Sequence, residues 1–153
     1  MNTDKIKIRD ATISDIGSSV KLLEQLFSIE KDFTFNSEKQ KQGLLMMLEG
    51  CSKHRTVKVA QYNATIVGMC SAQIRISTAR GNIVAIVEDL VVDSNYRNMG
   101  IGKRLLEAVY SWARKRGITT LQLLADKDNH SALNFYERQN WDRTNLICFL
   151  KTL

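Results

Sequence analysis

The sequence predicts a single mixed α/β domain built on a mostly antiparallel central sheet, and three observations support this fold class. The chain has 153 residues, of which 44% are apolar and 25% are charged, as in one ordinary globular domain. Strand-like and helical apolar periodicities continue from Ile6 to the C-terminus without a linker, repeat or low-complexity tract. Their order is one strand, two helices, three strands, then a helix, a strand, a helix and a strand, which indicates a mixed α/β fold over residues 1–153.

The N-terminal third predicts a strand and two helices. Ile6 and Ile8 alternate with charged residues, as in a half-buried strand. Ser14 is placed to cap a helix, and the apolar residues that follow at helical spacing are Ile16, Val20, Leu23 and Phe27. Ser37 and Gln40 form a capping-box pattern, which predicts that a second helix begins there.

The remaining elements follow from turn signals and from changes of period. Asn63 and Gly81 mark turns between strands that we expect to be antiparallel, and Gly117 stands where a left-handed helix C-cap belongs. The expected ranges are strands 56–62, 65–77 and 82–93, helix 102–116, strand 119–125, helix 129–139 and strand 145–153.

Composition excludes several classes of protein. No apolar run approaches the ~18 residues of a membrane span, and residues 1–10 mix charges instead of forming a signal-peptide core, so we expect a soluble cytoplasmic protein. Cys51, Cys70 and Cys148 lack paired spacing, which excludes a disulfide framework and a zinc cluster. We expect structural, buried thiols and no metal.

Net charge favours an anionic partner without choosing one. There are 22 Lys and Arg against 16 Asp and Glu, a formal charge of +6. The basic residues form no block of five or more, and no stacking aromatics accompany them, so nucleic acid is disfavoured. A polyphosphate cofactor fits the same charge.

Two adjacent carboxylates interrupt an otherwise apolar strand. Residues 83–92 are apolar at odd and even positions, which predicts a strand covered on both faces. Burying Glu88 and Asp89 there costs several kcal/mol unless partners or water meet them. Either basic or backbone partners satisfy the two carboxylates, or the sheet opens at this point.

A glycine turn follows this strand directly and precedes an amphipathic helix. In the run from Arg97 to Lys103, Gly100 and Gly102 let the backbone approach an anion closely. The unpaired amides and the positive end of the helix dipole suit a phosphate group. Leu105 excludes the dinucleotide-binding fingerprint, because that motif needs a small residue at this position. Arg104 excludes the NTPase phosphate loop, because that motif needs a Ser or Thr there.

The motif Arg97-x-x-Gly100-x-Gly102 resembles the acetyl-CoA pyrophosphate-binding signature of the GNAT N-acetyltransferase superfamily. Downstream, Asn129-x-x-Ala132-x-x-Phe135-Tyr136 resembles the second motif of that superfamily, and together the two cover roughly residues 87–141. Asn98 and Met99 depart from the pattern, since family members often carry a glycine after the motif arginine. The resemblance implies a sheet splayed between its fourth and fifth strands, helices on both faces, and a pantetheine arm lying in the gap.

The resemblance also implies site residues. Glu88 is the expected catalytic base, acting through water, with Asp89 kept open as the alternative; Tyr136 is the expected proton donor to the departing thiolate. By strand alternation Glu88 should share a face with Leu90 and Val92. The expected cofactor-binding residues are Leu90, Val92, Arg97, Asn98, Met99, Gly100, Ile101, Gly102, Lys103, Asn129 and Tyr136. Packing alone for Tyr136, and helix capping alone for Asn129, are the alternatives.

The function implied is acetyl transfer from acetyl-CoA, as cosubstrate, to a primary amine of a small molecule or peptide. The loop residues expected to border the groove and bind a cationic acceptor are Glu30, Asp32, Phe33 and Phe35, which otherwise form a solvated turn. A non-catalytic CoA-binding sensor or subunit is the alternative function, and a homodimer is compatible with the sequence.

Overall fold

The structure is a computed structural model that describes residues 5–153. Residues 1–4, which belong to the expected domain 1–153 and to the segment used to exclude a signal peptide, lie outside the described residues. The elements are β1 (Ile6–Asp10), α1 (Ile16–Phe27), α2 (Ser37–Glu49), β2 (Arg55–Tyr62), β3 (Thr65–Ser77), β4 (Asn82–Val92), α3 (Ile101–Arg114), β5 (Leu121–Leu123) and α4 (His130–Arg138). Two 3-10 turns lie at Ile13–Asp15 and Ser94–Tyr96.

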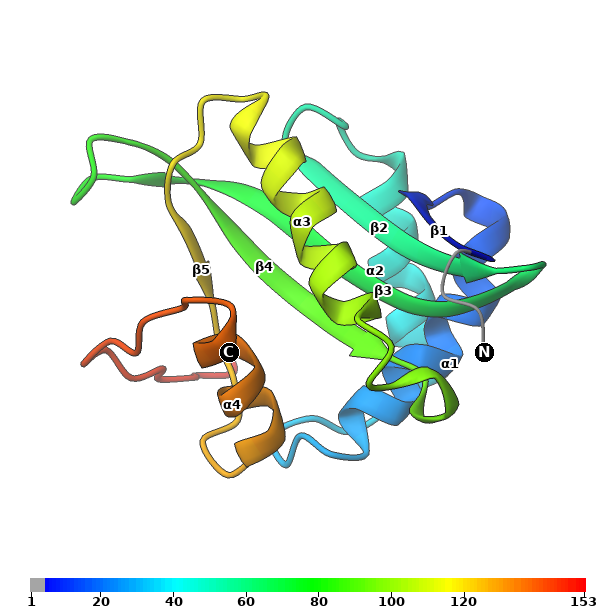
Figure 1. The fold of residues 1–153 in the computed structure, drawn as a ribbon. Helices are drawn as coiled ribbons and strands as arrows, with labels where there is room; N and C mark the ends of the chain where they lie inside the picture. Colours follow the sequence, from blue (N-terminus) through cyan, green and yellow to red (C-terminus); the bar gives the residue numbers. More distant parts are fainter. Residues whose placement is uncertain (1–4) are drawn as a thin grey trace.

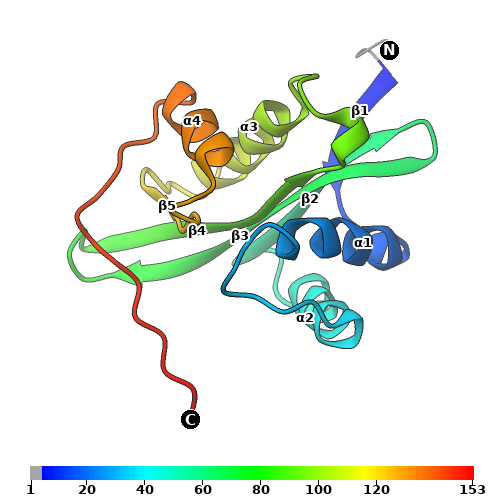
Figure 2. The same cartoon turned by 90° about the horizontal axis from the view of Figure 1, so that it is seen from below.

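The strands form one mixed sheet in the order β1-β2-β3-β4-β5. The first four strands are antiparallel to their neighbours, whereas β4 and β5 are parallel. Helices α1 and α2 cover one face, and α3 and α4 lie on the other (Figures 1 and 2). The predicted α/β class, with a mostly antiparallel sheet and helices on both faces, is confirmed.

Apolar side chains form one core on each face of the sheet. On β3, Met69 packs into the cluster beneath α1 and α2, and Cys70 packs into the cluster beneath α3. This alternation is what a strand covered on both faces requires. None of the helices formed by residues 5–153 has the length and the apolar character that crossing a membrane demands.

Strand β4 separates from β5 and then bulges. Met69 pairs with Val91 and Ser71 pairs with Glu88, so two residues of β4 lie opposite one residue of β3. Asp89, at the bulge, has a φ of 54°. Within the described chain β5 pairs only with residues 85–87 of β4, which confirms the predicted splay between the fourth and fifth strands.

The bulge overturns the expected orientation of Glu88. Glu88 lies opposite Ser71, and Ser71 lies opposite Val57 of the cluster beneath α1 and α2. Leu90 and Val92 instead pack against the cluster beneath α3. The prediction that Glu88 shares their face is wrong, because simple alternation assumes a strand without an inserted residue.

Two helix caps differ from those predicted. The first helical segment begins after Thr12, whose amide donates to the Asp15 carboxylate at 2.8 Å, and not at Ser14. The second helix is capped by Asn36, whose side chain accepts from the Lys39 amide at 3.1 Å. The α-helix α1 itself starts at Ile16 with Asp15 as its N-cap, one residue after the predicted cap. The cap of α2 lies one residue before the predicted one, because Asn36 offers an acceptor equivalent to that of Ser37.

The predicted last strand, 145–153, does not form. The segment is irregular, and its exposed apolar side chains are Leu146, Ile147, Phe149, Leu150 and Leu153; Figure 2 shows it leaving the body of the molecule. The strand predicted over 119–125 shortens to three residues, which leaves little edge for another strand to pair with. The expectation of buried thiols holds for Cys70 and fails for Cys51 and Cys148, which are exposed.

Candidate active site

The open edge of β4 borders a small pocket of about 70 Å³. It lies between β4, the segment after β5, α4 and the end of α1, where the ribbon of β5 leaves that of β4 (Figure 1). The lining residues are Leu26, Glu30, Val87, Glu88, Asp89, Leu90, Leu124, Ala125, Asp126, Asn129, Ala132 and Tyr136. The fold therefore gathers Glu88, Leu90, Asn129 and Tyr136, which were predicted from separate parts of the sequence.

The backbone groups of Leu90 and Val92 face this opening. The Asp93 amide donates to the Val67 carbonyl of β3 at 2.9 Å, so the main-chain groups of Val92 and Leu90 point to the other side by strand alternation. That side has no strand partner beyond residue 87 in the described chain. The bulge thus brings Leu90 to the free edge, where its role as a backbone binding residue stays a prediction.

The two carboxylates of the acidic pair have different surroundings. Asp89 accepts a hydrogen bond from the Ser71 hydroxyl at 3.0 Å, and its burial, with the nearby charge of Glu88, raises its pKa. Glu88 is exposed, and its Oε2 accepts from Nε2 of Gln73 at 3.1 Å. Glu88 is therefore the solvated carboxylate of the pair, and Asp89 is the half-buried one.

Two more carboxylates line the pocket, and the pocket contains no cationic side chain. Burial raises the pKa of Glu30, and the charges of Asp89, Asp126 and Asp32 add to the shift. Asp126 was missed from the sequence, although a carboxylate directly after a strand that borders a gap is a usable signal. None of the described lining residues is Lys, Arg or His, so the site carries strong negative potential.

The predicted acceptor loop contributes to the pocket only in part. Glu30 lines it, but Asp32 and Phe35 do not. The Phe33 ring stacks on Phe27 with centroids 5.2 Å apart. Within residues 5–153 no three His, Cys, Asp or Glu side chains are grouped to hold a metal ion.

Tyr136 of α4 lines the pocket and packs in an aromatic cluster. Its ring makes edge contacts with Phe135 and Trp141, with centroids 5.4 and 6.0 Å away. Burial, followed by the nearby charges of Cys70 and Glu30, raises the pKa of its phenol above the ordinary value. Tyr136 is both packed and placed on the pocket wall, and its hydroxyl keeps its proton at neutral pH.

Asn129 caps α4 and also lines the pocket. Its Oδ1 accepts from the Ala132 amide at 3.1 Å, which is the predicted capping role. The pocket reaches the same residue. Capping fixes the side chain at the pocket wall, so a second contact there requires no rearrangement.

The glycine turn presents free backbone donors. Gly100 is the N-cap of α3 with a φ of 72° and has no side chain to bond the first-turn amides. The amides of Ile101, Gly102 and Lys103 therefore point out at the positive end of the helix dipole. Asn98, which replaces the glycine of the resembling motif, has a φ of 61°, a conformation that Asn tolerates better than most residues.

Contacts around the turn fix its position. Nε of Arg97 donates to the Val92 carbonyl at 3.1 Å and ties the turn to the end of β4. A Cβ on Gly102 would lie 3.3 Å from Cζ of Phe135, so glycine there allows α4 to pack against the start of α3. Met99 packs partly against the core beneath α3, and Lys103 is exposed.

Comparison with known proteins links this arrangement to acyl transfer. A sequence model of the Acetyltransferase (GNAT) family matches residues 22–141. The uncharacterized N-acetyltransferase YhdJ of Bacillus subtilis is 35% identical over 94 residues, which are 60% of this chain and 66% of that protein. Streptothricin acetyltransferase A of the same organism is 32% identical over 72 residues, 47% of this chain and 41% of that protein. The match spans less than two thirds of the length of these relatives.

The same fold occurs in a solved structure. The aminoglycoside acetyltransferase meta-AAC0020, from an uncultured soil metagenomic sample and in complex with sisomicin, superposes with a TM-score of 0.78. It is 24% identical, and the match covers 98% of this chain and 97% of that one. At this level of identity the likeness is one of fold, and it extends over nearly the whole chain.

Proposed function

The chain belongs to the acetyltransferase (GNAT) family and is an acyltransferase, and on that premise we propose that it transfers an acetyl group from acetyl-CoA directly to a primary amine of a small molecule or peptide. One observation carries the proposal. Strand β4 leaves β5 after residue 87, and an acid, a phenol and free backbone groups meet at the resulting pocket. Thioester aminolysis needs a base, a proton donor and a site for developing negative charge.

The glycine turn fits the phosphates of the donor. The amides of Ile101, Gly102 and Lys103, which have no partner among residues 5–153, supply donors at a helix N-terminus. Arg97 and Lys103 are exposed cations beside them. The edge of β4 at Leu90 and the Val92 amide fits the amide groups of an extended arm, which would add to the sheet as a strand does.

The acidic pocket supports a positively charged acceptor. Four carboxylates, from Glu30, Glu88, Asp89 and Asp126, line it, and none of the described lining residues is cationic. An alkylamine with a pKa near ~10 arrives as an ammonium ion, which such a site attracts. One relative is named a streptothricin acetyltransferase, and the structural neighbour is named an aminoglycoside acetyltransferase. Both names refer to small molecules, which supports a small-molecule acceptor.

Three groups of the chain carry the reaction. Glu88, solvated at the rim, takes a proton from the ammonium through water and leaves a nucleophilic amine. The amide of Leu90 stabilises negative charge on the thioester oxygen, a role worth ~3 kcal/mol per donor. Tyr136 donates its proton to the departing sulfur as the C–N bond forms and the C–S bond breaks. The newly bonded nitrogen releases its second proton to solvent water, and Tyr136 recovers a proton from solvent.

The test is an acceptor screen that follows release of free thiol from acetyl-CoA. We expect turnover with at least one cationic primary amine, and Glu88→Gln should lower kcat most at low pH, where the amine is most protonated. Calorimetry with CoA gives an independent readout of donor binding. The proposal fails if CoA produces no heat, or if a broad panel of primary amines yields no acetylated product although CoA binds.

A further inference from the structure

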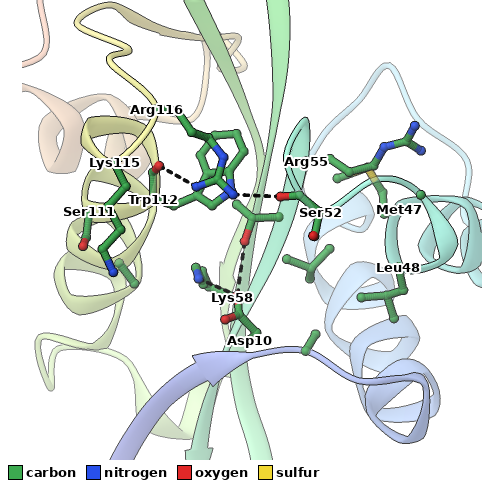
Figure 3. Close-up of a pocket in the computed structure, with 15 residues that line it drawn as sticks. Asp10, Met47, Leu48, Ser52, Arg55, Lys58, Ser111, Trp112, Lys115 and Arg116 are labelled. Atoms are coloured by element: carbon green, nitrogen blue, oxygen red, sulfur yellow. Dashed lines mark hydrogen bonds and ion pairs between the residues drawn. The ribbon is translucent and has the colours of Figure 1, made fainter.

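A second cavity, of about 440 Å³, lies at the far end of α3 from the glycine turn. Helix α3 has 14 residues, so its two ends are about 20 Å apart. Figure 3 shows the cavity between α3 and α2, across the sheet edge where β1 ends and β2 continues. Its volume is within the range of small-molecule sites.

The cavity has a polar half and an apolar half. Lys58 points to the α3 face of the sheet, because Ala60, two residues later, belongs to the core beneath α3. Ser111 and Lys115 line the same half from α3, and Met47 and Leu48 line the opposite half from α2. A ligand that fills the cavity would therefore meet charge at one end and apolar surface at the other.

Two of the cationic groups around the cavity are already used by the fold. Arg116 donates to the carbonyls of Ser52, Lys53 and Trp112 at 2.9, 2.8 and 3.0 Å, which fastens the turn before β2 to the end of α3. Arg55 donates to the Met46 carbonyl at 2.7 Å. These two guanidinium groups are structural supports of the cavity walls.

The two lysines have capacity to bind. Lys58 pairs with Asp10, whose side chain is 75% exposed and can turn away into solvent. Lys115 is exposed, and its ammonium group makes no hydrogen bond or ion pair with the described residues. Two ammonium groups therefore outnumber the single carboxylate, Asp10, on this side of the cavity.

A buried donor on the cavity wall also lacks a partner. Nε1 of Trp112 is fully buried and has no acceptor among residues 5–153. The Trp112 ring lies beneath the Arg116 guanidinium, whose Cζ is 4.7 Å from the ring centroid. Unpaired buried donors are rare in proteins, and this one belongs to a side chain that lines the cavity.

We propose that this cavity binds a small amphiphilic organic anion, a carboxylate or phosphate ester on an alkyl or aryl body. The anionic group lies between Lys58 and Lys115 and displaces Asp10 from Lys58. The apolar body crosses the sheet edge to Met47 and Leu48. The site is separate from the pocket at β4 and does not depend on the reaction proposed for that pocket.

Calorimetry with two probes, octanoate and octyl phosphate, tests the proposal and distinguishes the two head groups. We expect at least one probe to bind, and octanol and sulfate to bind at least about tenfold more weakly, since each lacks one half of the ligand. Saturating CoA should leave the affinity unchanged. No heat with either probe, or displacement by CoA, overturns the proposal.

Substitutions locate the binding. Ser111→Phe, at an exposed position, fills the cavity and should abolish binding; Lys115→Ala should weaken it about tenfold. Lys21→Ala, on exposed α1 surface, is the matched control and should change nothing. Probe binding that neither Ser111→Phe nor Lys115→Ala alters would place the ligand elsewhere and refute the site. Circular dichroism of each variant verifies that it is folded.

Discussion

The ionised form of Asp89 is destabilised in the folded protein. Its carboxylate is half-buried beside Glu88. Among the described residues it accepts a hydrogen bond from Ser71 alone, and loss of solvent raises its pKa from 3.8. The folded state therefore binds a proton more readily than the unfolded state does. Stability falls as the pH rises from 3.8 through the folded pKa, because the ionised group is destabilised in the fold.

Asp89→Asn should accordingly raise the melting temperature at pH 7, since it removes the half-buried charge and keeps an acceptor for Ser71. The gain should shrink as the pH falls and vanish below 3.8, where the wild-type carboxyl is protonated in both states. Thermal unfolding across this pH range measures it. A gain that is constant with pH would show that packing, and not ionisation, is responsible.

Tyr136→Phe tests the proton donor. We expect kcat to fall about 100-fold while KM for acetyl-CoA changes little, because only the hydroxyl is removed and the ring contacts remain. Steady-state kinetics of thiol release provide both constants. Tyr62→Phe, on β2 in contact with Tyr96, is the matched control; equal rates for wild type and Tyr136→Phe would leave Tyr136 with packing alone.

Asp15 shows the opposite electrostatic effect. The hydrogen-bonded Arg9 guanidinium, at 2.7 and 2.8 Å, lowers the pKa of Asp15 from 3.8 to about 2. Asp15→Asn should cost about 2 kcal/mol of unfolding free energy at pH 7. Because a lowered pKa stabilises the fold above 3.8 and is lost as the pH falls to about 2, the deficit should disappear in acid. Denaturant titrations at neutral and acid pH measure the deficit, and one that persists in acid would contradict this.

At the scale of elements, the first turn of α3 must satisfy two structural requirements. Its first-turn amides must stay free for an anion, and α4 must pack close to them. Gly102 meets both, since a Cβ there would lie 3.3 Å from the Phe135 ring. The same glycine leaves the first-turn amides unobstructed.

Gly102→Ala should therefore weaken CoA binding by about tenfold, a 1.4 kcal/mol effect, because Phe135 and with it α4 must shift. Gly43→Ala, in α2 with open space around its Cβ position, should leave binding unchanged and raise stability by roughly 0.5–1 kcal/mol. Calorimetry and unfolding curves distinguish the two variants. Unchanged CoA affinity in Gly102→Ala would mean that α4 does not need this contact.

Local patterns predicted the elements because period and capping chemistry are local properties. The Ser37–Gln40 pattern placed the second helix one residue from its true cap, since Asn36 offers the same kind of acceptor. The bulge at Asp89 was not predictable from residues 83–92, because it depends on the register against β3. Segment 145–153 has a strand-like composition, but pairing needs an edge elsewhere in the fold.

The sequence named residues that the fold brings together where their position depends on order along the chain. Leu90, Asn129 and Tyr136 line one pocket, and Val92 lies on the unpaired edge of β4 beside it; their roles stay predictions. Asp126 was missed because its approach to Glu30 depends on how far β5 diverges. Glu88 was predicted on the wrong face of the sheet because simple alternation does not include the bulge between Glu88 and Val91.

At the scale of the whole molecule, the C-terminal segment, residues 145–153, adds exposed apolar surface and contributes no buried residue to the core. Its exposed apolar residues, Leu146, Ile147, Phe149 and Leu150, follow one another in an extended stretch without charge. Such stretches favour self-association. We therefore expect the folded body to determine stability and this segment to determine self-association.

Truncation after Thr144 should leave the unfolding free energy within about 0.5 kcal/mol of the full chain, because the removed side chains are exposed. Sedimentation should show less self-association in the truncated chain. Denaturant unfolding checks the first expectation. A large loss of stability would mean that the segment packs against the sheet in solution.

The position of Cys148 on this exposed segment affects how the protein is handled. Cys148 and Cys51 are both open to solvent, whereas Cys70 is buried and its thiol pKa is raised, so Cys70 stays unreactive. In aerated buffer without a reductant, copies should become covalently linked through Cys148 and Cys51, and the linked species should migrate as ladders on non-reducing gels. Replacing both surface sulfurs by serine should give a preparation that ages without such linkage.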